Sequence, residues 1–373
     1  MPVVNVLMIE DSKDQQTLYK DALDDYNLEN NDKTINLDIV ESSDEAITKL
    51  NEKSYDAVLL DLLLKGDAGD GHNASGNLVL SHIINSGRIR LVVYVVSSTL
   101  HALSNDFEDL FENPLMRKFN RDEDTCLVIN DLVQVLNTGV TKILGGEGKL
   151  DRLINDVFFG HLSKGFDLWV KKNRDCEREL LRYVTLHLSE YLDQEDANHD
   201  STMNYFNPEF YILPPIKNPI ATGDIISVND KRYVVLSPSC DITPRGEKDG
   251  RLIFNVDVVV LVEIIPLKKE VFEDLGISYS TSGKTNAKAW RGFASVQRGT
   301  SPKQRYHYLP QYLDVDEAVI DFKRIINLSI NDILDNEKIK RIATISSPFV
   351  RDVQSRFSAY FGRQGQPSGE WSV

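Results

Sequence analysis

The segment Asp56–Leu64, DAVLLDLLL, is the strongest indication of the fold of the N-terminal region, since it predicts a strand at 57–60 that is apolar on both faces and ends at Asp61. Strands of this kind are typical of parallel sheets with helices on both sides. Similar apolar runs lie at 3–9, 35–40, 91–96 and 115–119, and amphipathic segments follow at 13–26, 44–53, 78–84, 102–111 and 125–144. With right-handed crossovers, this alternation predicts an α/β, doubly wound (βα)₅ domain over residues 1–144.

Polar side chains stand at the ends of four predicted strands. The first strand ends in Glu10 and Asp11, the third in Asp61 and the fourth in Ser97, while the fifth carries Lys118. Ligands of open α/β sheets bind beyond the carboxyl ends of the strands, so we expect these groups to converge. Clustered carboxylates repel one another, and Mg²⁺, a hard cation that prefers carboxylate and phosphate oxygens, would neutralise them. The pattern therefore predicts a phosphoryl-transfer site.

The roles in such a site follow from the chemistry of each group. Asp61 is the predicted nucleophile, which would form an aspartyl phosphate. Mg²⁺ and Lys118 would neutralise the transferring phosphoryl group. Ser97 would hydrogen-bond the new phosphoryl oxygens and so favour one of two conformations.

Four segments resemble the marker regions of response-regulator receiver domains: VLMIEDS (6–12), DAVLLDLLL (56–64), VVYVVSS (92–98) and MRKF (116–119). The resemblance implies that Asp11 and Asp61 bind Mg²⁺ directly, with the Leu63 backbone carbonyl as a third ligand. It implies that Glu10 acts through metal-bound water, and that a histidine kinase supplies the phosphoryl group. Ser97 lies 21 residues before Lys118, close to the spacing of the family's switch residue, which favours Ser97 over its neighbour.

Three departures from the family pattern concern signal relay. The loop 65–77 is longer than usual, Phe119 replaces the proline that commonly follows the lysine, and Leu115 stands where an aromatic switch residue is common. These departures argue against the usual relay from Ser97 to an aromatic residue, but not against phosphorylation.

The remaining residues predict a helical segment and a mainly β, α+β C-terminal domain. The expected boundaries are a glycine-rich linker at 145–149, a helical connector at 150–196, a β-rich output or interaction domain at 205–363 and a flexible tail at 364–373. Strands are expected at 224–228, 233–236 and 252–265, with helical segments at 316–326 and 350–360. Residues 223–237 faintly resemble PemK/MazF-type, SH3-like barrels, which favours a small barrel more than a ribonuclease.

Other candidate sites are weaker. Ser282–Thr285 reads SGKT, but a P-loop needs glycine at position 278, which is Ser278. Cys240 lacks a histidine nearby in the sequence and is interpreted as structural. The other histidines considered are His72, interpreted as an exposed loop residue, His161, interpreted as a packing residue, and the scattered His187 and His307.

Composition excludes some classes of protein. The net charge is −15, and residues 1–125 hold 24 Asp/Glu against 11 Lys/Arg, so no broad basic surface for nucleic acid is expected. No apolar run reaches the roughly 18 residues of a membrane span. The N-terminus does not resemble a signal peptide, and the cysteines are odd in number, so we expect a cytoplasmic location.

The leading hypothesis is a response regulator of a two-component system. Its C-terminal region would bind a downstream protein partner or form a homodimer, because the predicted helix offers apolar faces at Leu180, Leu181, Val184 and Leu188. The organisation resembles receiver components of anti-phage systems such as Detocs, and in that setting the protein would buffer phosphate. The alternatives are a DNA-binding transcriptional regulator and a C-terminal effector enzyme.

Overall fold

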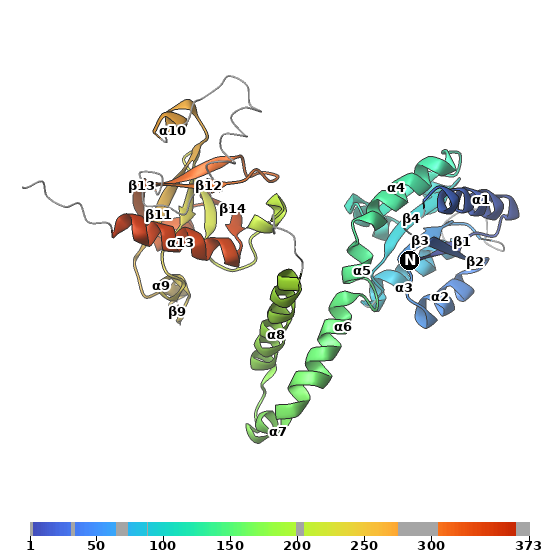
Figure 1. Ribbon diagram of the computed structural model, residues 1–373, viewed down its shortest axis with the longest axis horizontal. Coiled ribbons are helices and arrows are strands. Elements are labelled where there is room, and N and C mark those ends of the chain that lie inside the picture. Colours follow the sequence, from blue (N-terminus) through green and yellow to red (C-terminus); the bar gives the residue numbers. More distant parts are fainter. Residues whose placement is uncertain are drawn as a thin grey trace, which may run out of the picture. The chain divides into compact units, whose positions relative to one another are not determined.

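The computed structural model describes residues 3–30, 34–64, 74–87, 89–198, 205–274 and 305–362. The chain divides into two units, Met1–Asp200 and Ser201–Val373, which are shown in Figure 1 and treated separately here. His72, the stretch 282–285 and the tail 364–373 lie outside the described residues.

A five-stranded parallel sheet forms the centre of the first unit (Figure 1). Its strands are β1 (Val3–Ile9), β2 (Thr34–Val40), β3 (Ala57–Leu60), β4 (Val92–Ser97) and β5 (Met116–Asn120). Their order, β2-β1-β3-β4-β5, is the flavodoxin-like order of doubly wound sheets. The predicted α/β, doubly wound fold is confirmed.

Helices cover both faces of this sheet because its strands are apolar on both sides. On one face, α1 (Lys13–Glu29) and α4 (Thr125–Asn137) bury Tyr19 and Leu132 against β4. On the other face, α2 (Ser43–Glu52) and α3 (Ser75–Ser86) bury Leu50 and Leu80 against β3. Two separate cores therefore hold the sheet, and its carboxyl edge is free to carry polar side chains.

Two predicted helices of this domain differ from the structure. The segment predicted as a helix at 102–111 consists of two 3₁₀ helices, η1 (Leu100–Ala102) and η2 (Asn105–Glu112). No residue of η2 is buried, so packing adds little to stabilise a regular α-helix there. The helix predicted at 125–144 breaks after Asn137, because Gly139 takes a left-handed conformation (φ 79°) before the short α5 (Val140–Leu144).

A helical hairpin completes the first unit. Its first arm comprises α6 (Lys149–Asn155), the π-helical η3 (Asp156–Leu162) and α7 (Ser163–Lys171), and its second arm is α8 (Glu177–Asn198) (Figure 1). Asn173, with φ 47°, turns the chain between the two arms. The region predicted as a helical connector at 150–196 thus contains two helical arms.

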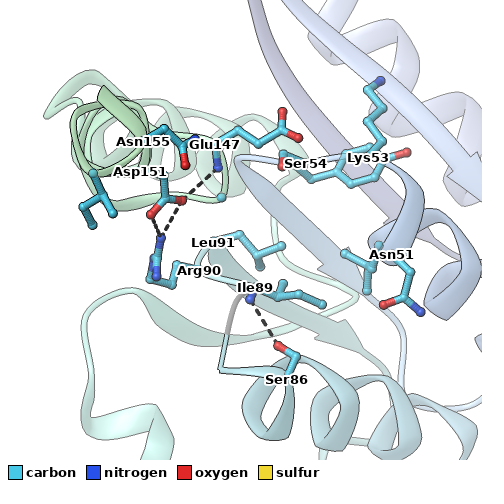
Figure 2. A pocket seen from close by; sticks show the side chains of 14 residues that line it. Asn51, Lys53, Ser54, Ser86, Ile89, Arg90, Leu91, Glu147, Asp151 and Asn155 are labelled. Carbon is cyan, nitrogen blue, oxygen red and sulfur yellow. Dashed lines mark hydrogen bonds and ion pairs between the residues drawn. The ribbon is translucent and has the colours of Figure 1, made fainter. Parts of the chain in front are cut away.

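Hydrogen bonds tie the base of the hairpin to the amino edge of the sheet. Both terminal oxygens of Asp151 in α6 lie 2.8 Å from the Arg90 guanidinium, which also donates to the Leu144 carbonyl. The Thr141 hydroxyl donates to Asp56 at 2.6 Å. Figure 2 shows the open polar hollow that Arg90 and Asp151 line, beside the turn at residues 145–148. In this turn the Gly148 amide donates to the Gly145 carbonyl at 3.0 Å.

The second unit is built on a seven-stranded sheet of order β12-β13-β11-β8-β7-β14-β6, whose neighbours all pair antiparallel. Its strands are β6 (Tyr211–Ile212), β7 (Asp224–Val228), β8 (Lys231–Val235), β11 (Val258–Pro266), β12 (Tyr306–Leu309), β13 (Ala318–Ser329) and β14 (Lys340–Ile345). Helix α13 (Ser347–Phe361) packs Val353 and Tyr360 into its core. The Tyr211 hydroxyl donates to the Pro310 carbonyl at 2.7 Å, which links the two ends of the sheet.

Two predictions for this unit are corrected. Residues 316–326, predicted as helical, lie largely in β13, where the buried run Ala318–Phe322 is stabilised by pairing with strands on both sides. The strand predicted at 252–265 is interrupted at 254–257, which separates β10 (Arg251–Ile253), paired with β9 (Gly246–Lys248), from β11.

Within the described ranges, no helix of either unit has the length and apolarity needed to cross a membrane.

Candidate functional site

Three carboxylates meet at the carboxyl edge of the parallel sheet. Glu10 and Asp11 follow β1, and Asp61 follows β3, which pairs with β1 so that Ile9 lies opposite Leu60. One oxygen from each carboxylate lies within 4.8 Å of the others. The convergence that the strand ends predict is therefore present for these three residues.

Burial makes this cluster electrostatically costly. Glu10 is 3% exposed and Asp61 is 4% exposed. The pKa of Glu10 is raised to about 7, mainly by burial and also by the charges of Asp61 and Asp11, while a hydrogen bond from the Ser12 amide opposes the rise. Burial also raises the pKa of Asp61, against a lowering by Ser97, Arg121 and two backbone amides. The negative charges thus stand close together with little water to solvate them.

The geometry of the cluster suits a divalent cation. Asp61 Oδ1 is buried and has no hydrogen-bond partner among the described residues. The backbone amides of Leu62 and Leu63 lower the pKa of Asp61, so Leu63 lies beside the cluster, where its carbonyl is predicted to bind metal. Mg²⁺ prefers carboxylate oxygens as ligands, and the three carboxylates of this cluster supply them.

Ser97 completes this part of the site. It ends β4, is fully buried and lowers the pKa of the Asp61 carboxyl, whereas Ser98 is exposed. Successive residues of a strand point to opposite faces, so only one of these two serines can face the carboxylates. The structure therefore brings Ser97 to the predicted nucleophile.

Lys118 is not joined to the carboxylate cluster. It lies in β5 opposite Val95, and its Nζ forms a 2.5 Å ion pair with Glu108 of η2. The same ammonium group stands over the Phe111 ring at 5.2 Å from the centroid. No ion pair or hydrogen bond links Lys118 to Glu10, Asp11 or Asp61 in the part of the chain that the structure describes.

Arg121 is the cationic residue that the structure places in the site and that the sequence analysis missed. Its Nη2 lies 2.8 Å from Glu10 Oε2 and also forms an ion pair with Asp61 Oδ2. The only signal for it in the sequence is a basic residue just beyond the fifth strand. Such a residue is too common in loops to single out without the tertiary fold.

Gly76 is a second residue that the sequence analysis did not single out. Its amide, in the first turn of α3, donates to the Leu62 carbonyl at 3.0 Å. A Cβ at this position would lie 2.6 Å from the Asp61 carbonyl oxygen and 2.7 Å from Leu62 Cα. The absence of a side chain therefore lets α3 approach the backbone of the predicted nucleophile.

We expect Gly76→Ala to destabilise the region around Asp61 by about 1–3 kcal/mol, because backbone atoms cannot move aside as a flexible side chain can. Hydrogen exchange of peptides that span β3, measured by mass spectrometry in the full chain, would report this as faster exchange. Gly165→Ala in α7 is the control, since its Cβ would meet nothing within 4 Å. Unchanged exchange in β3 of the Gly76 variant would contradict the close approach.

The cysteine and histidine candidates do not form a nucleophilic pair in the second unit. Cys240 is exposed, and its thiol contacts Asp241 Oδ1 at 3.6 Å. His307 lies in β12, where burial lowers its pKa to about 4, and it contacts Asp352 in α13. In the first unit, His161 is exposed, and its Nε2 lies 2.8 Å from the Tyr191 hydroxyl across the hairpin. The described residues therefore give no histidine partner to Cys240.

Comparison with known proteins gives similarity at the level of fold. No protein-family model and no curated protein matches the chain. A receiver domain from Methylobacillus flagellatus is 19% identical, with 36% of this chain and 98% of that chain covered and a TM-score of 0.26. The response regulator TrrA of Thermotoga maritima, solved with Mg²⁺ and BeF, is 18% identical, with 36% and 98% covered and a TM-score of 0.27.

A third similar structure is the receiver domain of a sensor histidine kinase from Pseudomonas aeruginosa, solved with a magnesium ion in its active-site cleft. It is 18% identical, with 36% of this chain and 98% of that chain covered and a TM-score of 0.27. Each match spans little more than a third of this chain. The fold assignment therefore rests on the strand order and the two cores of the first unit.

Proposed function

We propose that this protein is a response regulator of a two-component system, in which Asp61 accepts a phosphoryl group from a histidine kinase. The observation that carries the proposal is the cluster of buried Glu10, half-buried Asp11 and buried Asp61 at the carboxyl edge of a sheet of flavodoxin-like order. Carboxylates are buried together at a cost, which a bound cation and a transferable phosphoryl group would offset.

Each residue has a distinct part in the reaction. An oxygen of the Asp61 carboxylate forms a bond to phosphorus while the P–N bond of the phosphohistidine breaks. Its electron pair goes to the nitrogen, which solvent protonates. Asp11, Asp61 and the Leu63 carbonyl would hold Mg²⁺ directly and Glu10 would act through water, and the ion would supply positive charge to the phosphoryl oxygens. The Ser97 hydroxyl, which lowers the pKa of Asp61, would donate a hydrogen bond to a phosphoryl oxygen.

A small phosphodonor tests the proposal without the partner kinase. The full chain, incubated with phosphoramidate and Mg²⁺, is expected to gain the mass of one phosphoryl group. The adduct is expected to survive acid and to be lost in mild base, as an acyl phosphate would be. A folded protein that gains no mass under these conditions would refute the proposed function.

The helical hairpin supports an output by protein contact. Two packed helices cannot enclose a core, and this hairpin leaves large apolar side chains exposed, among them Phe159, Leu168 and Leu181. The predicted apolar positions Leu180, Val184 and Leu188 are only half-buried. We infer that a second copy of the hairpin covers these residues in a four-helix arrangement. A further protein partner, a phosphate-buffering role and the link to Detocs-like systems stay predictions.

We expect phosphorylation of Asp61 to shift self-association of the full chain by about 1–3 kcal/mol, the usual size of an allosteric coupling. Sedimentation velocity with and without phosphoramidate would measure the shift.

Leu181→Ser in α8 is expected to weaken the dimer by about tenfold or more, because a 69% exposed apolar side chain would be lost from the contact. Leu28→Ser is the control on α1, where the side chain is 80% exposed. A chain that stays monomeric at all concentrations would contradict the homodimer.

A further inference from the structure

A tight turn after β5 carries Arg121 into the acidic site. The Glu123 amide donates to the Asn120 carbonyl at 3.0 Å, and the Asn120 amide donates to the Glu123 carboxylate at 2.8 Å. The Arg121 amide donates to the Ser97 carbonyl at 3.2 Å, which ties the turn to the end of β4. The backbone of Arg121 is therefore fixed beside Ser97, at the end of β4.

The Arg121 guanidinium group has a hydrogen-bond donor that its contacts do not use. Nη2 bonds both Glu10 and Asp61, while Nε is buried and has no partner among the described residues. Asp61 Oδ1, on the carboxylate that Arg121 contacts, is likewise buried and unpaired. A buried donor and a buried acceptor without partners each cost free energy unless a further group satisfies them. A phosphoryl group attached to Asp61 offers three acceptor oxygens to such a donor.

The other cationic residues around the site are engaged elsewhere. Lys118 pairs with Glu108 and lies over Phe111. Lys13, in the first turn of α1, pairs with Glu41 and is exposed. Arg117, next to Lys118 on β5, pairs with Asp131 in α4 at 2.6 Å. Among the described residues, Arg121 is the cation whose contacts are with the carboxylates of the site.

We propose that Arg121, rather than Lys118, is the catalytic cation that holds the phosphoryl group on Asp61. This inference rests on the proposed phosphoacceptor function. A guanidinium presents its N–H groups in a fixed fork that matches phosphate oxygens, so it suits this role at least as well as an ammonium group. Before transfer Arg121 balances part of the charge of Glu10 and Asp61, and one guanidinium against three carboxylates still leaves charge for a divalent cation.

The test compares Arg121→Ala, Arg121→Lys and Lys118→Ala in the full chain, with Arg117→Ala as the matched control. Labelling by phosphoramidate and Mg²⁺ affinity by calorimetry are measured for each. Arg121→Ala is expected to slow labelling by about 100-fold, the usual effect of removing one preorganised donor. It is also expected to tighten Mg²⁺ binding, because a competing positive charge is gone. Arg121→Lys is expected to recover part of the rate, and Arg117→Ala to match the unmodified protein.

The two measured effects of Arg121→Ala have opposite directions, so general damage to the site cannot produce both. Labelling of Arg121→Ala at the rate of the unmodified protein would overturn the inference. A loss on Lys118→Ala as large as that on Arg121→Ala would do so as well. An unmodified protein that takes no label at all would instead refute the proposed function, which separates the two failures.

Discussion

Asp61→Asn is expected to abolish phosphorylation by phosphoramidate and by any partner kinase while the fold stays intact. The amide that replaces the carboxylate is nearly isosteric but is not a nucleophile toward phosphorus. The buried β3 that carries Asp61 keeps its core contacts in the variant, because Leu60 and Leu62 are unchanged. Mass spectrometry of the labelled protein and of its peptides would show the loss and its position.

The control for this variant is Asp44→Asn in the first turn of α2, an exposed carboxylate on the same domain. It is expected to take one phosphoryl group as the unmodified protein does. Undiminished labelling of Asp61→Asn would move the phosphoacceptor to another residue of the cluster, with Asp11 the next candidate. Circular dichroism of both variants would separate a lost reaction from a lost fold.

Asp11→Ala is expected to weaken Mg²⁺ binding by more than about 100-fold, since even partners outside the direct ligand set change metal affinity by 10–100-fold. Asp11 supplies one of the two predicted direct carboxylate ligands, and the charge that remains is too small to dehydrate the ion. Isothermal titration calorimetry with MgCl₂ would measure the affinity. Phosphorylation by phosphoramidate is expected to fall with it.

Two comparisons make this metal prediction specific. Asp14→Asn, an exposed carboxylate in the first turn of α1, is expected to bind Mg²⁺ as the unmodified protein does. Lys118→Ala is expected to bind Mg²⁺ with equal or higher affinity, because its ammonium group adds only positive charge to the region. Equal losses of Mg²⁺ binding in Asp11→Ala and Lys118→Ala would show that the metal site is elsewhere.

Much of the fold could be predicted because its signals are local. The strands predicted at 3–9 and 57–60 have these bounds in the structure, since short apolar runs followed by polar residues mark buried parallel strands. The errors at 102–111 and 316–326 arose where a local apolar pattern suits a helix, while packing or strand pairing decides the outcome. Pairing of β13 with β11 and β12 is a long-range contact that no window of sequence contains.

For the candidate site, strand order and strand ends were enough to predict that Glu10, Asp11, Asp61 and Ser97 meet at one edge, because parallel strands all end at the same edge of a sheet. Which cation faces them depends on the packing of the folded chain. Arg121 is 60 residues from Asp61 and 111 from Glu10 along the chain, and a turn brings it to both. Lys118 is held by Glu108 instead, and Gly76 leaves room for α3 beside Asp61. These contacts depend on the direction of side chains after a turn, and residue order alone does not set that direction.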